Sequence, residues 1–150
     1  MHPEPVSLQP IRLGPGDASD CSGLDQLALG GLWGLEQWGR ELEHPSGLVL
    51  GLRHGPQLLG LACGQTIVDE FHVTAVAVHP DWRRRGLALT LLRSLLAEAR
   101  QGGCLRATLE VDQTNGPAVT LYGRLGFETA GLRRAYYRSG GDALIQWCTL

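Results

Sequence analysis

The chain has 150 residues, of which 43% are hydrophobic, and its formal net charge at pH 7 is −2. A chain of this length forms one domain that buries about two thirds of its unfolded surface, so we expect a single domain over residues 1–150. The charge balance lacks the broad basic excess of a nucleic-acid-binding protein, so we expect no nucleic-acid partner.

No segment of the sequence predicts export or membrane insertion. The N-terminus lacks a basic start followed by an apolar core, and no apolar run approaches membrane-spanning length. The four cysteines form no C-x-x-C pair and the five histidines lack ligand spacing, so neither a metal site nor a redox motif is indicated. We therefore expect a cytoplasmic monomer that has no membrane partner and needs no metal.

The first third of the sequence predicts a strand and helices. We expect Met1–Pro5 to be disordered and Val6–Leu13 to form a first strand, and either Asp17 or Ser19 is suited to cap a helix that starts nearby. From Asp25 to Leu42 the pattern is helical but is interrupted by glycines at 30, 31 and 34, which predicts two short helices. Because propensity specifies glycine-rich helices weakly, this pair is a candidate for a mobile lid over a site.

The middle of the sequence predicts three strands and a long helix. Leu48–Leu52 and Leu58–Gln65 have strand patterns and are joined by a turn around His54-Gly55-Pro56. Phe71–His79 is apolar on both faces near its end, as in a central strand. The long helix runs from about Gly86 to Arg100, with apolar residues at helical spacing and a glycine pair after its end.

The last third predicts a strand at Cys104–Val111 and a short helix opened by Asn115 as cap, with Pro117 in its first turn. Two further strands follow, at Glu128–Tyr137 and Ala143–Cys148. The predicted order is strand, two helices, three strands, helix, strand, helix and two strands. We therefore expect an α/β (α+β) fold with a mixed central sheet of about seven strands flanked by about four helices.

The segment before the long helix is suited to binding an anion. Arg83, Arg84 and Arg85 precede the helix, and Gly86 and Ala88 leave room for an anion to approach the backbone. The first helical turn has N–H groups without intrahelical partners and carries about half a positive charge. A solvated arginine face followed by an ordinary turn is the alternative interpretation.

Two common nucleotide sites are excluded for this segment. All 13 basic residues are arginine, so the chain lacks the lysine of a Walker-type P-loop. No G-x-G-x-x-G fingerprint follows a first strand, so a Rossmann dinucleotide site is not indicated either. We expect a phosphate or pyrophosphate ligand of another kind.

Two side chains in the last third are candidates for acid–base chemistry. Glu110 lies near the carboxyl end of a predicted central strand, where it acts as a general base or forms an ion pair with Arg106 or another arginine. Tyr122 lies on the apolar face of the short helix, where it is either a core residue or a general acid for a thiolate leaving group. Asn115 is most simply a helix cap, and its amide is also able to contact a cofactor.

Two segments resemble a known family. The segment AVAVHPDWRRRGLALTLL, Ala75–Leu92, is similar to the acyl-coenzyme A motif of the GNAT acetyltransferases. That motif consists of Arg or Gln, any two residues, Gly, any one residue, and then Gly or Ala. Arg83, Gly86 and Ala88 occupy these three positions here. LEVDQTNGPAVTLYGRLGF and the following LRRAYY resemble one branch of the family, the ribosomal-protein alanine N-acetyltransferases. The likeness extends from about Trp33 to the end of the chain.

The resemblance implies a role for each matching residue. It implies that acetyl-CoA is the donor substrate, that Glu110 is the general base and that Tyr122 is the general acid. It implies that acetyl passes directly to an amine in a ternary complex, without a covalent enzyme intermediate. The residues that it assigns to the cofactor are Val76, Ala77 and Val78 for the pantetheine and thioester, Arg83, Arg84, Arg85, Gly86, Leu87, Ala88 and Leu89 for the pyrophosphate, and Asn115.

The sequence departs from the branch at three positions. Asp112 stands where relatives commonly carry arginine, Ala88 stands in place of a glycine, and Leu89 replaces a residue that is often basic. Asp69 and Glu70 are acidic and are suited either to attract a basic peptide N-terminus or to form a solvated loop.

Three functions follow as hypotheses. The first is an Nα-acetyltransferase whose acceptor is the N-terminal amine of a protein, with the N-terminal alanine of a ribosomal protein as the candidate. The second keeps the fold and the donor but has a small-molecule amine as acceptor. The third is a module that binds acyl-CoA without turnover, which the presence of both Glu110 and Tyr122 disfavours.

Overall fold

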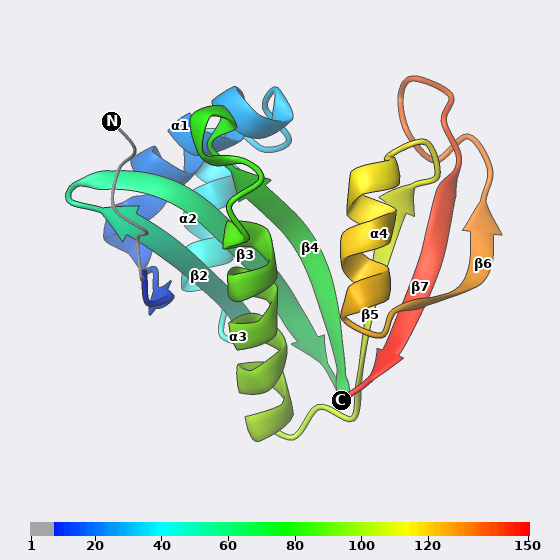
Figure 1. The fold of residues 1–150 in the computed structure, drawn as a ribbon. Helices are drawn as coiled ribbons and strands as arrows, with labels where there is room; N and C mark the ends of the chain where they lie inside the picture. The colour runs from blue at the N-terminus through cyan, green and yellow to red at the C-terminus, as the bar shows by residue number, and fades with distance from the viewer. Residues whose placement is uncertain (1–7) are drawn as a thin grey trace. The chain divides into compact units, whose positions relative to one another are not determined.

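The computed structural model describes residues 8–150, so the expected disorder of Met1–Pro5 lies outside the described residues. Within this range seven strands form one sheet in the order β1-β2-β3-β4-β5-β7-β6, accompanied by four α-helices (Figure 1). The elements are β1 Ile11–Arg12, α1 Ala18–Leu29, α2 Leu35–Glu43, β2 Gly47–His54, β3 Gln57–Ile67, β4 Glu70–Val78, α3 Leu87–Gln101, β5 Arg106–Asp112, α4 Gly116–Arg124, β6 Glu128–Arg133 and β7 Ala143–Thr149. The predicted fold class and element order are confirmed.

The chain divides into two compact units. The first contains the residues up to Gln65 together with Thr74–Leu95, and the second contains Thr66–Val73 and Leu96–Leu150. Strand β4 and helix α3 each contribute residues to both units.

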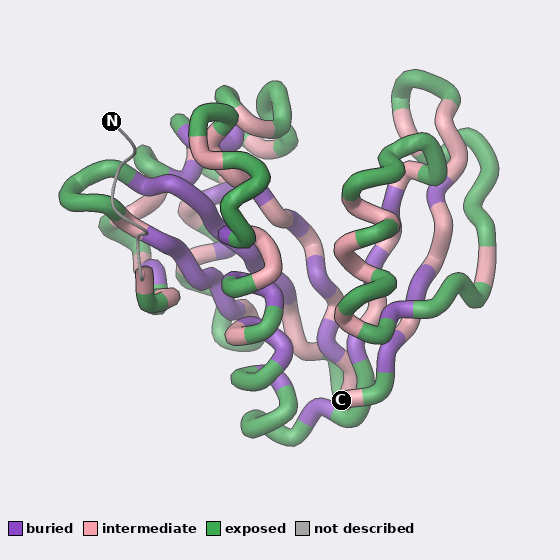
Figure 2. The backbone as a smooth tube through the Cα atoms, viewed as in Figure 1, coloured by how far each residue is buried: buried purple, intermediate pink, exposed green. Residues whose placement is uncertain are grey.

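In the first unit helices cover both faces of the strands (Figure 1). Helix α3 lies against one face, where Gly60 of β3 approaches it so closely that an added Cβ would be 3.0 Å from Leu91 Cδ1. Helices α1 and α2 cover the other face through a cluster of buried residues: Leu13, Cys21, Leu24, Trp38, Val49, Leu58, Leu61, Cys63, Ala75 and Ala77. Strand β3 is therefore buried along most of its length (Figure 2).

A buried carboxylate organises the glycine-rich turn between α1 and α2. Asp25 is fully buried, and its oxygens accept hydrogen bonds from Leu32 N at 2.7 Å, Trp33 N at 2.8 Å and Trp38 Nε1 at 2.9 Å. Gly30 ends α1 in a left-handed conformation with φ 74°, as a glycine after a helix commonly does. Three donors compensate for the desolvation of the charge, so this turn has specific anchors that the glycine pattern did not predict.

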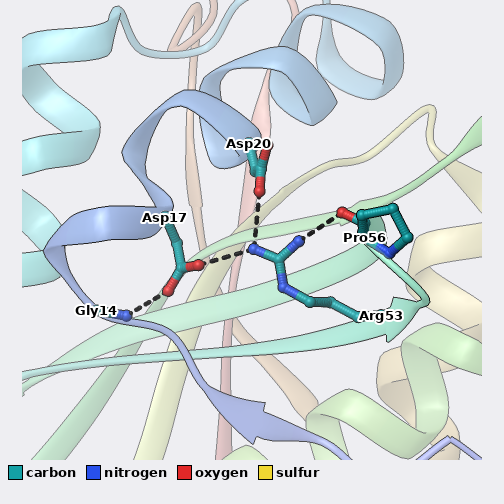
Figure 3. A network of polar contacts seen from close by, with 5 residues as sticks. All are labelled: Gly14, Asp17, Asp20, Arg53 and Pro56. Atoms are coloured by element: carbon teal, nitrogen blue, oxygen red, sulfur yellow. Dashed lines mark hydrogen bonds and ion pairs between the residues drawn. The ribbon is translucent and has the colours of Figure 1, made fainter.

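A second polar network joins the start of α1 to the β2–β3 hairpin (Figure 3). Arg53 Nη2 donates to Asp17 Oδ1 at 2.7 Å and to Asp20 Oδ2 at 2.8 Å, and Nη1 donates to the Pro56 carbonyl at 2.9 Å. The other oxygen of Asp17 accepts from Gly14 N at 2.8 Å. Asp17 thus stands at the predicted helix start, but its side chain bonds Gly14 and Arg53 instead of capping the helix.

The second unit is a small antiparallel arrangement with one parallel pairing. Strand β7 pairs along the full length of β5, from Arg106 with Thr149 to Asp112 with Ala143, and pairs with β6 on its other side. Residues Glu70–His72 of β4 pair in parallel with Arg106–Thr108 of β5. This short parallel ladder brings side chains of β4 next to those of β5.

Two predicted boundaries are wrong for identifiable reasons. Strand β6 ends at Arg133 instead of continuing to Tyr137, because Ala135 takes a left-handed conformation with φ 51° and its N–H donates to Asp142 Oδ1 at 2.8 Å. The predicted strand over Val6–Leu13 is reduced to β1 in the described part, Ile11–Arg12.

Among residues 8–150 no helix combines the length and apolarity needed to cross a bilayer.

Replacing Arg53 with methionine should lower the stability of the protein. The substitution keeps most of the apolar stem but removes three hydrogen bonds, two of them to carboxylates. Charge-assisted bonds at a largely buried side chain predict a loss of about 1–2 kcal/mol in the free energy of unfolding. Urea unfolding followed by circular dichroism measures the loss, and Arg93→Met on the exposed side of α3 is the matched control. Equal effects of the two substitutions would contradict the proposed role of the network.

Candidate functional site

The segment of Arg83–Gly86, here called the arginine loop, has an unusual backbone. Arg84 and Gly86 both adopt left-handed conformations, with φ 64° and 78°. A non-glycine residue in this region is strained by about 1–2 kcal/mol, and such strain concentrates at functional sites. Left-handed residues within a turn bring successive backbone N–H groups together into a concavity that binds anions.

Helix α3 begins directly after the arginine loop and adds its own donors. The first-turn N–H groups of a helix have no intrahelical carbonyl partners and lie at the positive end of the helix dipole. The start of this helix is fixed because one face is buried, including Leu91, Leu92 and Leu95 at 0% exposure. Thr90 closes the first turn, since its N and Oγ1 both donate to the Gly86 carbonyl at 3.0 Å.

Two of the three arginine side chains are held by neighbours in the first unit. The guanidinium of Arg85 stacks over the Trp82 ring, with Cζ 4.6 Å from its centroid. Arg83 Nη2 donates to the Ala28 carbonyl near the end of α1 at 3.2 Å. All three arginines are exposed, so the loop presents positive charge together with free backbone donors. Anion binding by this loop stays a prediction, and the solvated turn stays its alternative.

Strand β4 supplies the remaining predicted cofactor residues of the first unit. Its burial alternates, with Ala77 buried at 2% exposure and Val76 and Val78 partly buried. The chain leaves the strand at His79, whose N–H donates to the Leu59 carbonyl at 2.7 Å. The residues near the end of the strand are apolar on both faces, as in a central strand. Their alternating burial shows that one of the two faces is more accessible to solvent.

Glu110 lies in the second unit and is paired with a histidine. Its Oε2 is 2.7 Å from His72 Nε2, and the two side chains are 17% and 32% exposed respectively. The alternative interpretation, an ion pair with Arg106, is wrong because Arg106 Nη2 bonds Glu70 Oε1 at 2.8 Å and its guanidinium stacks on Trp147. Residues 106 and 110 are four positions apart in an extended strand, too far for contact. Glu70 is thereby engaged in an ion pair.

Tyr122 lies on helix α4, against the ring of Phe127 at a centroid distance of 5.9 Å. Burial, with a smaller contribution from Tyr137, raises the pKa of Tyr122 to about 12. The phenol is therefore protonated and neutral at physiological pH, as a proton donor must be.

Asn115 caps helix α4, as predicted. Its Oδ1 accepts from Ala118 N at 3.2 Å, and its side chain remains exposed. Asp112 accepts from Thr114 N at 2.9 Å and Thr114 Oγ1 at 2.8 Å. These two hydrogen bonds hold the pKa of Asp112 below its usual value. Asp112 thus organises the turn that leads into α4.

Sequence reasoning missed two residues near Glu110. His72 is one of five scattered histidines, and only the parallel pairing of β4 with β5 brings it to Glu110. Burial raises the pKa of Tyr137, and the charges of Asp112, Tyr136 and Glu110 add to this effect, which places the phenol in the same neighbourhood. The two adjacent tyrosines at 136 and 137 were the sequence signal that points to Tyr137.

Residues 8–150 contain no cluster of three or more metal-ligating side chains.

A comparison with protein families identifies the chain. The model described as the acetyltransferase (GNAT) family matches residues 20–127. The chain belongs to this family and is an acetyl-CoA-dependent acyltransferase. The resemblance found in the sequence motifs is confirmed.

Several relatives have names that place them among N-alpha-acetyltransferases and ribosomal-protein alanine N-acetyltransferases. The chain is 39% identical over 148 residues to the N-alpha-acetyltransferase RimI of Mycobacterium tuberculosis, covering 92% of each protein. It is 37% identical over 111 residues to a putative ribosomal protein bS18-alanine N-acetyltransferase of Bacillus subtilis, covering 73% of each. The crystal structure of the ribosomal-protein-S18-alanine N-acetyltransferase from Escherichia coli matches with a TM-score of 0.88 and 29% identity, over 95% of this chain and 93% of that one.

Replacing Gly86 with valine should weaken coenzyme A binding. A β-branched side chain disfavours the left-handed backbone at φ 78°, so the loop would lose the conformation that gathers its N–H groups. We expect the dissociation constant for coenzyme A, measured by calorimetry, to rise at least about tenfold, the effect of roughly 1.4 kcal/mol. Gly39→Ala in helix α2 is the control, because open space surrounds that position. Unchanged affinity of the Gly86 variant would contradict the assignment of the loop.

The phenol of Tyr122 should ionise well above the usual pKa of a tyrosine. Burial raises its pKa to about 12, well above the unperturbed value near 10. NMR titration of protein labelled at the tyrosine Cζ carbons measures each ionisation, and Tyr122→Phe assigns the resonance. A Tyr122 signal that titrates at or below the unperturbed value would show that the phenol is not desolvated.

Proposed function

We propose that this protein is an Nα-acetyltransferase that transfers acetyl from acetyl-CoA to the N-terminal amine of a protein in the cytoplasm. We propose an N-terminal alanine of a ribosomal protein as the acceptor. The proposal is supported by the names of relatives that match most of the chain at 37–39% identity and act on protein N-termini or on ribosomal protein alanine. The observation that carries it is the partly buried carboxylate of Glu110 at the position that the branch motif assigns to the base.

The proposed donor site lies in the first unit. The backbone N–H groups of Arg84–Leu89 hold the pyrophosphate of coenzyme A, and the charges of the arginine loop add attraction. Backbone groups of Val76, Ala77 and Val78 bind the pantetheine, and their N–H groups stabilise the oxyanion that forms when the thioester carbonyl is attacked. One such donor typically contributes a few kcal/mol to lowering the barrier. The exposed amide of Asn115 in the second unit is a further contact for the cofactor.

The proposed acid–base chemistry lies in the second unit. An α-ammonium group has a pKa near 7.7–8.0, so a base of modest strength frees the nucleophilic amine at neutral pH. Glu110 supplies this base function, and the neutral phenol of Tyr122 donates a proton to the departing thiolate of coenzyme A. The amine attacks the thioester directly, so no covalent enzyme intermediate forms.

Glu110→Gln should abolish most of the acetylation of a peptide that begins with alanine. The amide retains the shape of the carboxylate but cannot accept the proton, and general-base catalysis typically contributes 10²–10⁴-fold. We expect kcat at neutral pH to fall by about 100-fold or more. Glu128→Gln, at an exposed glutamate on β6, is the matched control. Near-wild-type kcat in Glu110→Gln would refute the assigned base.

The acceptor class is tested with the same enzyme and a panel of substrates. We expect the alanine peptide to be acetylated at its α-amine, and the same peptide with a blocked N-terminus to remain unmodified. Efficient acetylation of polyamines or amino-sugar antibiotics, with none of the peptide, would replace the protein acceptor with a small amine.

A further inference from the structure

We propose that Glu110 acts through His72: the proton of the acceptor amine passes to Nδ1 of His72, while the Glu110 carboxylate holds the imidazole in the required tautomer. This inference rests on the proposed function and refines it: the base function assigned there to Glu110 belongs to the His72–Glu110 pair, in which His72 takes the proton and Glu110 is required to position and stabilise it. The observation behind it is the contact between His72 Nε2 and Glu110 Oε2 at 2.7 Å. The sequence motifs did not predict this contact.

The contact determines which ring nitrogen carries the proton. A carboxylate has only acceptor atoms, so Nε2 must donate the hydrogen bond. In a neutral imidazole the other nitrogen, Nδ1, then has a free lone pair and is the basic atom. A carboxylate that fixes a histidine tautomer and stabilises the imidazolium is a recurring arrangement for a general base.

Exposure and position favour the histidine as the group that meets the acceptor. The His72 side chain is 32% exposed, whereas that of Glu110 is 17% exposed and one of its oxygens is already engaged. His72 is held at this place by the register of β4 with β5, where it pairs with Thr108. The hydroxyl of Thr108 donates to the Gln146 carbonyl at 2.9 Å and so does not compete for the imidazole. The phenol of Tyr137 also lies close enough to Glu110 for the carboxylate to raise its pKa, an effect smaller than those of burial, Asp112 and Tyr136.

The unperturbed pKa values of an imidazole and a carboxyl group also favour the histidine as the group that takes the proton. An unperturbed imidazole has a pKa near 6.5, about 1–1.5 units below an α-ammonium, whereas an unperturbed glutamate lies about 3.5 units below it. Proton transfer is most effective when the base is matched to the operating pH. An imidazole is therefore the better matched acceptor of the two.

The proton balance of the reaction is satisfied by this pair. Acetylation of an ammonium by a thioester yields an amide, a thiol and one proton released to solvent. Two N–H bonds of the acceptor ammonium break. The first proton passes to Nδ1 of His72, where the carboxylate of Glu110 compensates the charge of the imidazolium, and from there to water, which restores the neutral tautomer. The second leaves the nitrogen for solvent as the amide forms. The C–S bond breaks, the thiolate takes its proton from Tyr122, and the phenolate is reprotonated from solvent, so that the net release is one proton.

Substitution of His72 tests whether this residue acts as the base or has only a structural role. In His72→Gln the side-chain amide still donates a hydrogen bond to Glu110 but offers no basic nitrogen. We expect its kcat to fall by about 100-fold or more, as in Glu110→Gln, and the double variant to be no slower than either single one, because the pair acts as a unit. Near-wild-type kcat in His72→Gln, or additive losses in the double variant, would overturn the proposal. His44→Gln, at an exposed histidine of the first unit, is the control.

Two further measurements do not depend on that variant alone. Imidazole added to His72→Ala should restore activity in proportion to its concentration, and no rescue would count against a base role. Long-range proton–nitrogen NMR of the wild-type protein should show the Nε2–H tautomer of His72, and an Nδ1–H tautomer would overturn the proposal without any activity assay. Wild-type protein that acetylates no amine-terminated peptide would instead refute the proposed function, whereas an active wild type with an active His72→Gln refutes only the base.

Discussion

The buried face of helix α3 is the constraint on which the proposed donor site depends. Leu91, Leu92 and Leu95 are fully buried, and Gly60 of β3 provides the close approach that fixes the helix on the strands. Because the helix cannot slide or rotate without exposing this face, its first turn occupies a defined place. The left-handed backbone at Arg84 and Gly86 then joins a helix end whose position is fixed.

The residues proposed for acid–base chemistry depend on a different constraint, the pairing of strands in the second unit. Register places Glu110 opposite Ile145 of β7 and places His72 opposite Thr108 of β5. Glu110 carries a charge at low exposure, and the histidine partner compensates part of its desolvation. Backbone pairing thus determines which titratable groups meet, and helix α4 adds the desolvated phenol of Tyr122.

The sequence predicted the features that repeat locally and missed those that need long-range contact. The order of strands and helices and the cap at Asn115 followed from spacing and turn residues. The partner of Glu110 did not, because 38 residues separate it from His72 and no local pattern marks a parallel pairing. The buried Asp25, which anchors the α1–α2 turn, was missed for a related reason: its donors lie on the turn and on the next helix. The end of β6 was misplaced since the Asp142 contact to Ala135 is invisible in a propensity pattern.

The central claim is that the arginine loop holds coenzyme A while the acceptor amine meets the His72–Glu110 pair. A crystal structure with a bisubstrate analogue, in which coenzyme A is joined through acetyl to the α-nitrogen of an alanine peptide, tests it most directly. The account predicts the pyrophosphate on the backbone N–H groups of Arg84–Leu89 and the α-nitrogen within hydrogen-bonding reach of His72 Nδ1, directly or through one water. A pyrophosphate bound elsewhere, or an α-nitrogen remote from both His72 and Glu110, would contradict it.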